Sequence, residues 1–184
     1  TLHEWVVGTG CTQLSDDVVG LAGTPGSLVV MHLDRSLAAF DAVSHVFTPL
    51  PASPQPALGD LWVTADGVWT TADPGNRYQT VLQNFDGTQW RSWRLEGAAA
   101  AQELVGGATG RTFLRGYGAN TIQRYRSATH DFELVQLPWG RWDTIWSPGN
   151  GRLWAWAEIV GAAELLTYDG TAFARGGALQ GFRV

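Results

Sequence analysis

Three Asp-Gly pairs are the first residues of this sequence to consider as a chemical site. Carboxylates at such positions can bind calcium or act as a paired acid and base. A calcium loop of the EF-hand type needs alternating carboxylates and a Glu at its end, and the sequence has neither. Asp-Gly is also a preferred pair for a two-residue type I′ hairpin turn, in which both residues have positive φ. We therefore predict structural turns and no metal at Asp66-Gly67, Asp86-Gly87 and Asp169-Gly170.

The histidines and the cysteine give little support for a metal site or for catalysis. The sequence contains His3, His32, His45, His130 and a single cysteine, Cys11. The histidines never occur at zinc-ligand spacing, and one cysteine allows no internal disulfide. Motifs of serine hydrolases, phosphate-binding loops and zinc proteases are absent from the sequence. A Ser-His-Asp triad can still assemble from distant residues, because triads are defined by geometry. We predict no cofactor, no metal and no identifiable catalytic residue.

Tryptophan and arginine carry the strongest indication of a binding site. On a strand, Trp90 and Trp93 point to opposite faces, so one can be buried while the other is exposed. Trp139, Arg141 and Trp142 lie at a junction between repeats, where loops are expected. An exposed Trp with polar neighbours can stack on a sugar ring or anchor a protein partner. The alternative is that packing between sheets consumes these side chains. The candidate ligand-binding residues are Trp93, Trp139, Arg141 and Trp142.

Composition excludes two classes of partner. The chain of 184 residues has a net charge of −5 and no basic cluster, which argues against nucleic acid and anionic membranes. No apolar run approaches the length of a membrane span, so we expect no membrane insertion. With 23 Gly and 8 Pro, the composition is that of a turn-rich all-β protein.

A degenerate repeat of about forty residues predicts the fold. The aromatic residues Phe40, Phe85, Tyr125 and Tyr168 are 45, 40 and 43 residues apart, and each precedes a polar turn and another aromatic. A period in this range, made of short strands, is typical of a β-propeller with one four-stranded blade per repeat. We predict an all-β, propeller-like array of about four four-stranded blades.

A second series of residues keeps the same period. Gly26, Gly67, Gly110 and Gly151 each precede the second strand of a repeat and are 41, 43 and 41 residues apart. The interval between the two hairpin aromatics is seven residues in repeats one and three and five in repeats two and four. We expect one domain, 1–184, with repeats at about 15–56, 57–97, 98–138 and 139–179 and end segments 1–14 and 180–184.

The end segments leave closure of the array open. Residues 4–8 read as a strand, and either end segment can add a strand to the blade at the other terminus. The alternative is an array whose edges pair with another chain or with further sequence.

Repeats two and four resemble a known type of repeat. In repeat four the matching residues are Ile145-Trp146, Leu153 to Trp156, Leu165 to Gly170 and Phe173. In repeat two they are Leu61 to Val63, Phe85 to Gly87 and Trp90. This pattern resembles the tandem Tyr-Asp-Gly-x-x-Trp repeats of secreted bacterial β-propeller proteins. Repeats one and three have Asp41-Ala42 and Arg126-Ser127 where the pattern has Asp-Gly. The resemblance implies a secreted or periplasmic binding or scaffolding module, and it provides no catalytic residues to transfer.

Three functions remain open at this point. The first is a non-catalytic binding or scaffolding module outside the cytoplasm, acting as a subunit of a larger assembly with a protein partner or a second copy of itself. The alternative is a lectin-like protein that binds carbohydrate through Trp-rich rim loops. The third is a hydrolase-type enzyme on a propeller scaffold, because a fold alone does not decide function.

Overall fold

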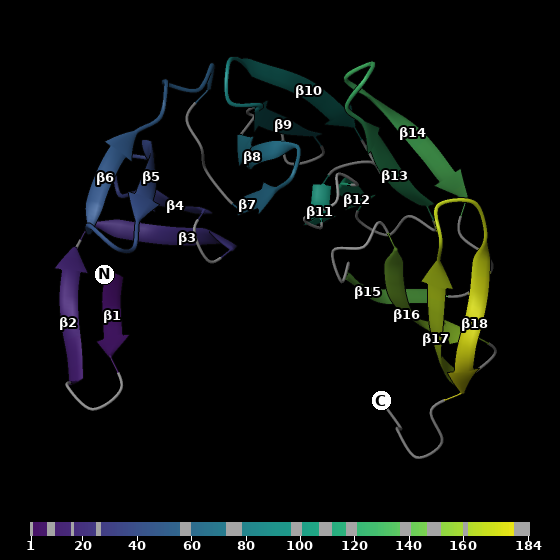
Figure 1. Cartoon of the computed structure of the whole chain (residues 1–184). Helices are drawn as coiled ribbons and strands as arrows, with labels where there is room; N and C mark the ends of the chain where they lie inside the picture. The colour runs from purple at the N-terminus through teal and green to yellow at the C-terminus, as the bar shows by residue number, and fades with distance from the viewer. Residues whose placement is uncertain are drawn as a thin grey trace. The chain divides into compact units, whose positions relative to one another are not determined.

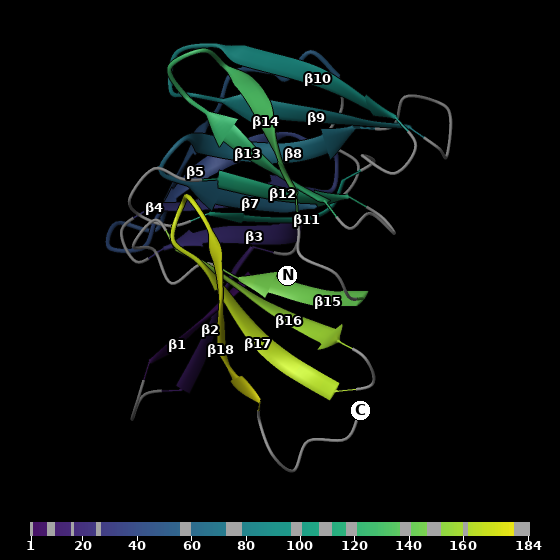
Figure 2. The same cartoon turned by 90° about the vertical axis from the view of Figure 1, so that its right-hand side faces the viewer.

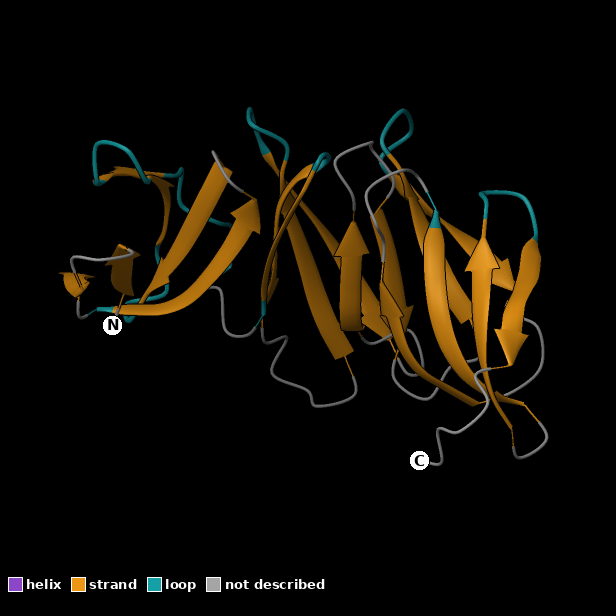
Figure 3. Ribbon diagram, turned by 60° about the horizontal axis from the view of Figure 1, so that its bottom comes forward, coloured by secondary structure: helices purple, strands orange, loops and turns teal. Residues whose placement is uncertain are grey.

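The structure is a computed structural model of the chain, shown in Figure 1. All regular secondary structure in the described part is β-strand (Figure 3), and no membrane-crossing helix occurs there. The described residues are 2–6, 10–15, 17–24, 27–55, 60–72, 79–96, 101–106, 112–116, 121–136, 141–146, 152–159 and 162–178.

Four antiparallel sheets of four strands each follow one another along the chain, and we call them blades one to four. Blade one contains β3 (Val18–Thr24), β4 (Ser27–His32), β5 (Leu37–Asp41) and β6 (Val46–Pro49). Blade two contains β7 (Leu61–Thr64), β8 (Gly67–Ala72), β9 (Gln79–Phe85) and β10 (Trp90–Glu96). Blade three contains β11 (Ala101–Gly106), β12 (Thr112–Gly116), β13 (Thr121–Arg126) and β14 (Asp131–Gln136). Blade four contains β15 (Arg141–Trp146), β16 (Leu153–Ile159), β17 (Ala162–Tyr168) and β18 (Phe173–Ala178).

The predicted fold class is confirmed. Strands pair in chain order within every blade, as a series of hairpins produces, and Figure 2 shows this order in blade four. The four aromatics of the repeat all lie in the third strand of a blade and are buried. The period of the sequence therefore reports one sheet per repeat. These residues are Phe40, Phe85, Tyr125 and Tyr168.

The N-terminal segment forms a hairpin of its own. β1 (Leu2–Val6) pairs with β2 (Gly10–Ser15) in a two-stranded antiparallel sheet. The expected strand at residues 4–8 thus overlaps β1. Residues 180–184 lie outside the described residues, so an exchange of strands between the ends stays a prediction.

The chain divides into two compact units. The first comprises Thr1–Val63 and Gly67–Arg94, and the second comprises Thr64–Asp66 and Leu95–Val184. Within the first unit, blades one and two pack through a core that includes Met31, Leu37 and Phe85. That residues 1–184 make one domain stays a prediction.

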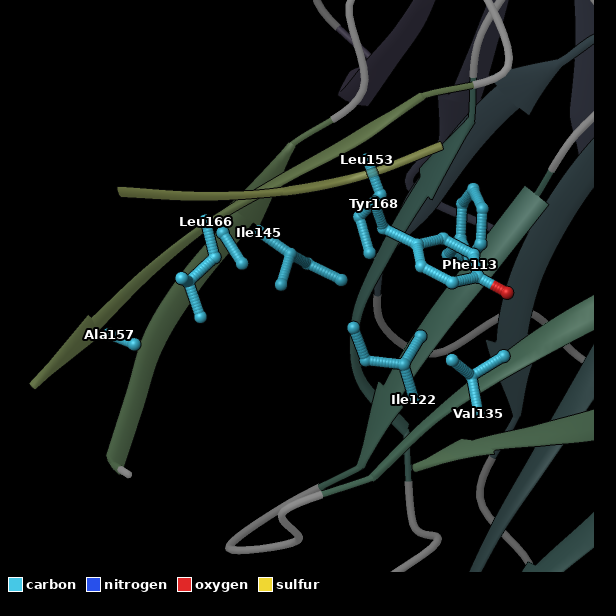
Figure 4. Packing of buried hydrophobic residues seen from close by; sticks show 9 residues of the cluster. Phe113, Ile122, Val135, Ile145, Leu153, Ala157, Leu166 and Tyr168 are labelled. Atoms are coloured by element: carbon cyan, nitrogen blue, oxygen red, sulfur yellow. The ribbon is translucent and has the colours of Figure 1, made fainter. Parts of the chain in front are cut away.

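The second unit has its own core between blades three and four. Figure 4 shows the side chains of Phe113 and Tyr168 next to each other, with a centroid distance of 6.1 Å in an edge-on contact. Both faces contribute aliphatic side chains around them. These are Ile122 and Val135 from blade three, and Ile145, Leu153, Ala155, Ala157 and Leu166 from blade four.

The short hairpin turns of blades two and four differ from the predicted type. Gly87 and Gly170 have positive φ, at 96° and 104°, but neither Asp86 nor Asp169 does. The prediction of type I′ turns is therefore wrong. The Asp86 carboxylate accepts the N–H groups of Thr88 and Gln89 at 2.9 and 3.0 Å, and the Asp86 N–H donates to the Gln89 carbonyl. Because the side chain replaces a backbone acceptor, the loop extends to four residues and needs only one left-handed residue.

The longer turns of blades one and three use histidine where the short turns use glycine. His45 and His130 have φ of 58° and 54°, and each N–H donates at 2.8 Å to the carbonyl four residues earlier. The ring of His45 stacks on Phe40 at 6.3 Å. The ring of His130 shares a 3.0 Å hydrogen bond with the Tyr125 hydroxyl. The seven-residue interval of these repeats is thus a turn closed by a left-handed residue.

This conformation predicts the effect of substitutions at His45. A β-branched residue is strongly disfavoured at positive φ, so His45→Val should lower the free energy of unfolding by about 1–2 kcal/mol. His45→Asn should stay within about 0.5 kcal/mol of the wild type, because Asn tolerates this region. Urea denaturation of both variants checks the prediction, and equal losses would show that the ring contact and not φ decides.

Candidate functional site

The structure places Trp93 in a packed position. Trp93 lies on β10, is partly exposed, and stacks on Trp69 at 5.8 Å with an interplanar angle of 27°. Trp69 is completely buried. On the other face of the strand, Trp90 packs against Phe85 and donates its indole N–H to the Pro51 carbonyl at 2.8 Å. Packing within the sheet therefore engages one ring face of Trp93.

The other three predicted site residues are only partly described. Arg141 and Trp142 lie in β15, opposite Glu158 and Ala157, and not in a loop. Their side chains lie outside the described part, as does all of Trp139. That these residues form one rim site with Trp93 stays a prediction.

The acidic side chains of the hairpin turns are engaged in holding the turns. Hydrogen bonds from the Thr88 hydroxyl, the Gln89 N–H and Arg91 hold the pKa of Asp86 well below its usual range. In blade four, the backbone N–H groups of Ala172 and Thr171 lower the pKa of Asp169. Because each carboxylate accepts several hydrogen bonds in its charged form, it is poorly suited to act as a proton donor or acceptor. The structural reading of these turns is confirmed.

Asp66, from the remaining Asp-Gly pair, belongs to a cycle of hydrogen bonds within the second unit. The buried Thr112 hydroxyl donates to the Asp66 carboxylate at 2.5 Å. Since a hydroxyl has one proton, Thr112 must accept the 2.9 Å bond that it shares with the Thr64 hydroxyl. The Thr64 oxygen in turn accepts the Asp66 N–H at 3.1 Å. The cycle orients Asp66 for a structural role in its turn.

Blade three provides a pH-dependent test of such a turn. Arg126 donates twice to the Asp131 carboxylate at 2.7 Å, and the Thr129 hydroxyl donates once at 2.6 Å. The bonds from Arg126 and then Thr129 lower the pKa of Asp131 to about 2.

A lowered pKa in the folded state gives stability that is present above the unfolded pKa of about 4 and is lost on acidification. We expect the stability of the protein to decline as pH falls from about 4 through about 2. The Asp131→Asn variant should melt below the wild type at neutral pH, and the gap should close at low pH. The gap should be small, since these side chains are half-exposed and salt screens them. Thermal melts across pH check this, and a gap that widens on acidification would contradict it.

A hollow of about 300 Å³ lies at one end of blade one, within the first unit. The turn Asp34–Leu37 and the segment Leu50–Ser53 line it. The nearby His32 Nδ1 lies 3.0 Å from the Asp17 carboxylate. The Ser36 hydroxyl, however, donates to Asp34 at 2.6 Å and therefore uses its proton to cap the turn. The Asp, His and Ser of this region are thus not connected as a catalytic triad would require.

A more unusual arrangement occurs on one face of blade four. Trp146 on β15 pairs directly with Trp154 on β16, and their rings stack at 6.1 Å with an angle of 19°. Trp156 lies two residues further along β16 and thus on the same face. Trp146 is 40% exposed, and the other two are partly exposed. We call Thr144, Trp146, Trp154, Trp156, Leu165 and Thr167 the tryptophan face.

Strand pairing shows which positions of the other blades correspond to this face. Trp154 pairs with the residue just before the hairpin aromatic of β17. By the same criterion its equivalents are Val29, Trp69 and Phe113. All three are buried, and Val29 and Phe113 belong to cores with the next blade of the chain. Blade four therefore presents, partly exposed, the face on which blades one and three pack against their successors.

Sequence reasoning did not select Trp146, Trp154 and Trp156 as site residues. The signal was present, since the alternation Leu-Trp-Ala-Trp from Leu153 to Trp156 places two Trp on one face. What was missing is the exposure of that face, which depends on the absence of a packed neighbour and not on local pattern.

The chain is an all-β protein of four-stranded antiparallel blades, and solved structures share this propeller-like fold. It is 16% identical to a streptogramin B lyase, with a TM-score of 0.56, over 94% of this chain and 60% of the lyase. It is 15% identical to virginiamycin B lyase from Staphylococcus aureus, with a TM-score of 0.54, over 86% of this chain and 54% of that enzyme. U3-55K is 10% identical with a TM-score of 0.53, over 86% and 51%.

The chain thus spans between about half and three-fifths of the length of these structures. No protein-family model matches the sequence, and no curated protein matches it either. At such identities the likeness shows the fold alone. The Tyr-Asp-Gly repeat type remains a resemblance of the sequence.

Proposed function

We propose that this chain is a non-catalytic binding or scaffolding module that acts outside the cytoplasm as a subunit of a larger assembly. One observation carries the proposal. The tryptophan face is partly exposed in blade four, whereas the equivalents of Trp154 in the other three blades are buried. Large apolar side chains gathered on an accessible sheet face are typical of a surface that binds another protein. The location outside the cytoplasm rests on the repeat resemblance.

The acidic residues of the turns give further support. Asp86 and Asp169 spend their hydrogen-bonding capacity on their own loops. Ser36 does the same with Asp34. These groups stabilise a rigid array, which is what a scaffolding module needs.

Native mass spectrometry of the chain recovered from its natural source tests the proposal. We expect a complex heavier than one chain, because the tryptophan face is occupied there. A chain that is monomeric in the natural extract, before any purification, would contradict the assembly role.

Carbohydrate binding is a second candidate function, and the exposure of Trp146 is the observation that favours it. A Trp ring that is 40% exposed can stack on a pyranose face. A glycan array combined with Trp fluorescence quenching tests this, with Trp146→Thr as the variant that should lose the response. Absence of a response to every glycan would dismiss the lectin reading.

Enzyme activity is the third candidate, and the fold neighbours suggest one concrete assay. Two of the neighbours are named as lyases of streptogramin B and virginiamycin B. Because one fold hosts many chemistries, this likeness alone assigns no activity to the chain. Incubating the purified chain with streptogramin B and following the compound by mass spectrometry should leave it unchanged. Turnover of the compound would contradict the non-catalytic proposal.

A further inference from the structure

We infer that the partner of the tryptophan face is the same face of a second copy of this chain, packed sheet on sheet about a two-fold axis. This inference rests on the proposed binding function and names its partner.

The positions of the face fit a sheet as occupant. Val29 of blade one, which corresponds to Trp154, packs into a core with Val68 and Phe85 of the next blade. Phe113 of blade three, which also corresponds to it, packs against the sheet of blade four. The interfaces in this series thus join two four-stranded sheets face to face. A second sheet at blade four continues the same mode of packing, in which inner side chains interdigitate.

The chemistry of the face allows it to meet a copy of itself. None of the side chains that the structure describes on it is charged. Arg152 borders the face just before β16 and interacts electrostatically with Asp169. A two-fold interface brings identical patches together, so charged residues would often face like charges, and this face avoids that cost. The stacked Trp146 and Trp154 form a rigid aromatic centre of the kind that anchors interfaces.

The outward face of blade one is a weaker choice of partner surface. Its central residues Val30, Ala38 and Phe40 are already buried in a cluster with Val18. Little apolar surface remains there for a second copy to cover. A tryptophan face on a second copy offers three partly exposed indoles instead.

Sedimentation velocity of the purified chain tests the inference. We expect a dimer that dissociates on dilution through the micromolar range, as suits a small interface. The Thr144→Glu variant places a charge in the middle of the face, where desolvation penalises it, and should weaken dimerisation by about tenfold or more. Thr144→Val keeps the shape without the charge and should still dimerise.

Two further variants control for folding and for charge. Leu134→Glu adds the same charge to an exposed position on blade three and should leave the dimer intact. Trp146→Thr, at a position already exposed, should weaken the dimer even where Thr144→Glu fails to fold. Circular dichroism establishes that each variant is folded.

The outcomes separate this inference from the proposed function. A purified wild-type chain that is monomeric throughout the range overturns the inference, and so does a folded Thr144→Glu variant that dimerises like the wild type. If the purified chain is monomeric but the natural extract contains a larger complex, the binding function stands and its partner is a different protein. Protection of Trp146 by a glycan without dimerisation would assign the face to carbohydrate instead.

Discussion

Replacing Gly67 with alanine is expected to destabilise the protein by roughly 3–5 kcal/mol. Gly67 begins β8 with φ of 118°, a conformation that side chains rarely adopt. A Cβ at this position would overlap the carbonyl oxygen of Phe85 and lie 3.0 Å from its carbonyl carbon. Both obstructing atoms belong to the backbone of the paired strand β9, so relief requires the sheet to move. Backbone strain and steric overlap therefore add.

Gly87 provides the matched control, because it has positive φ without the obstruction. Its φ is 96°, and a Cβ there would meet no atom within 4 Å. Gly87→Ala should cost only the conformational strain, about 1–2 kcal/mol. Chemical denaturation of both variants measures the difference, which isolates the contact with Phe85. Equal losses at the two positions would show that the strand pair yields to the added methyl group.

The sequence was sufficient to predict the sheets because two anchors per repeat kept the same period. Phe40 and its three counterparts each occupy the buried third strand, where a large ring is needed to fill the space between blades. Gly67 shows why the second anchor persists, since a tight start of β8 next to Phe85 admits no side chain. Constraints that act within one repeat recur in each copy, and recurrence makes them visible without a structure.

The turn type was not predictable from the Asp-Gly pair alone. Type I′ geometry and the observed four-residue loop both place glycine at positive φ. What decides between them is the Asp86 carboxylate, which accepts two N–H groups and lets Asp86 itself keep negative φ. His45 and His130 were likewise invisible as left-handed residues, because sequence rules favour Gly, Asn or Asp there.

The candidate site depended on what a strand packs against, which local pattern does not contain. Trp69 and Trp154 occupy equivalent positions in their blades and both stack on another Trp. One is completely buried and the other is partly exposed. The sequence pointed to Trp93, beside Trp69, because composition cannot distinguish the two environments.

Truncation of Phe113 to alanine is the second substitution with a large expected effect. Phe113 is fully buried at the centre of the core between blades three and four, in edge-on contact with Tyr168 (Figure 4). Removing the ring loses its burial and leaves a cavity, at a cost of about 3–5 kcal/mol. For a protein of this size that corresponds to a lower Tm by on the order of 10 °C.

The neighbouring surface residue Leu134 separates this cavity effect from a general loss of apolar side chains. Leu134 lies on β14 of the same blade and is 62% exposed, so Leu134→Ala should change the free energy of unfolding by no more than about 0.5 kcal/mol. Phe113→Leu keeps part of the volume and should fall between the two. Because Phe113 is the blade-three equivalent of Trp154, its loss also measures how much a residue at this position stabilises when a neighbouring sheet covers it. If Phe113→Ala is as harmless as Leu134→Ala, the position contributes little even when buried, and the argument that an uncovered tryptophan face attracts a second sheet loses its energetic basis.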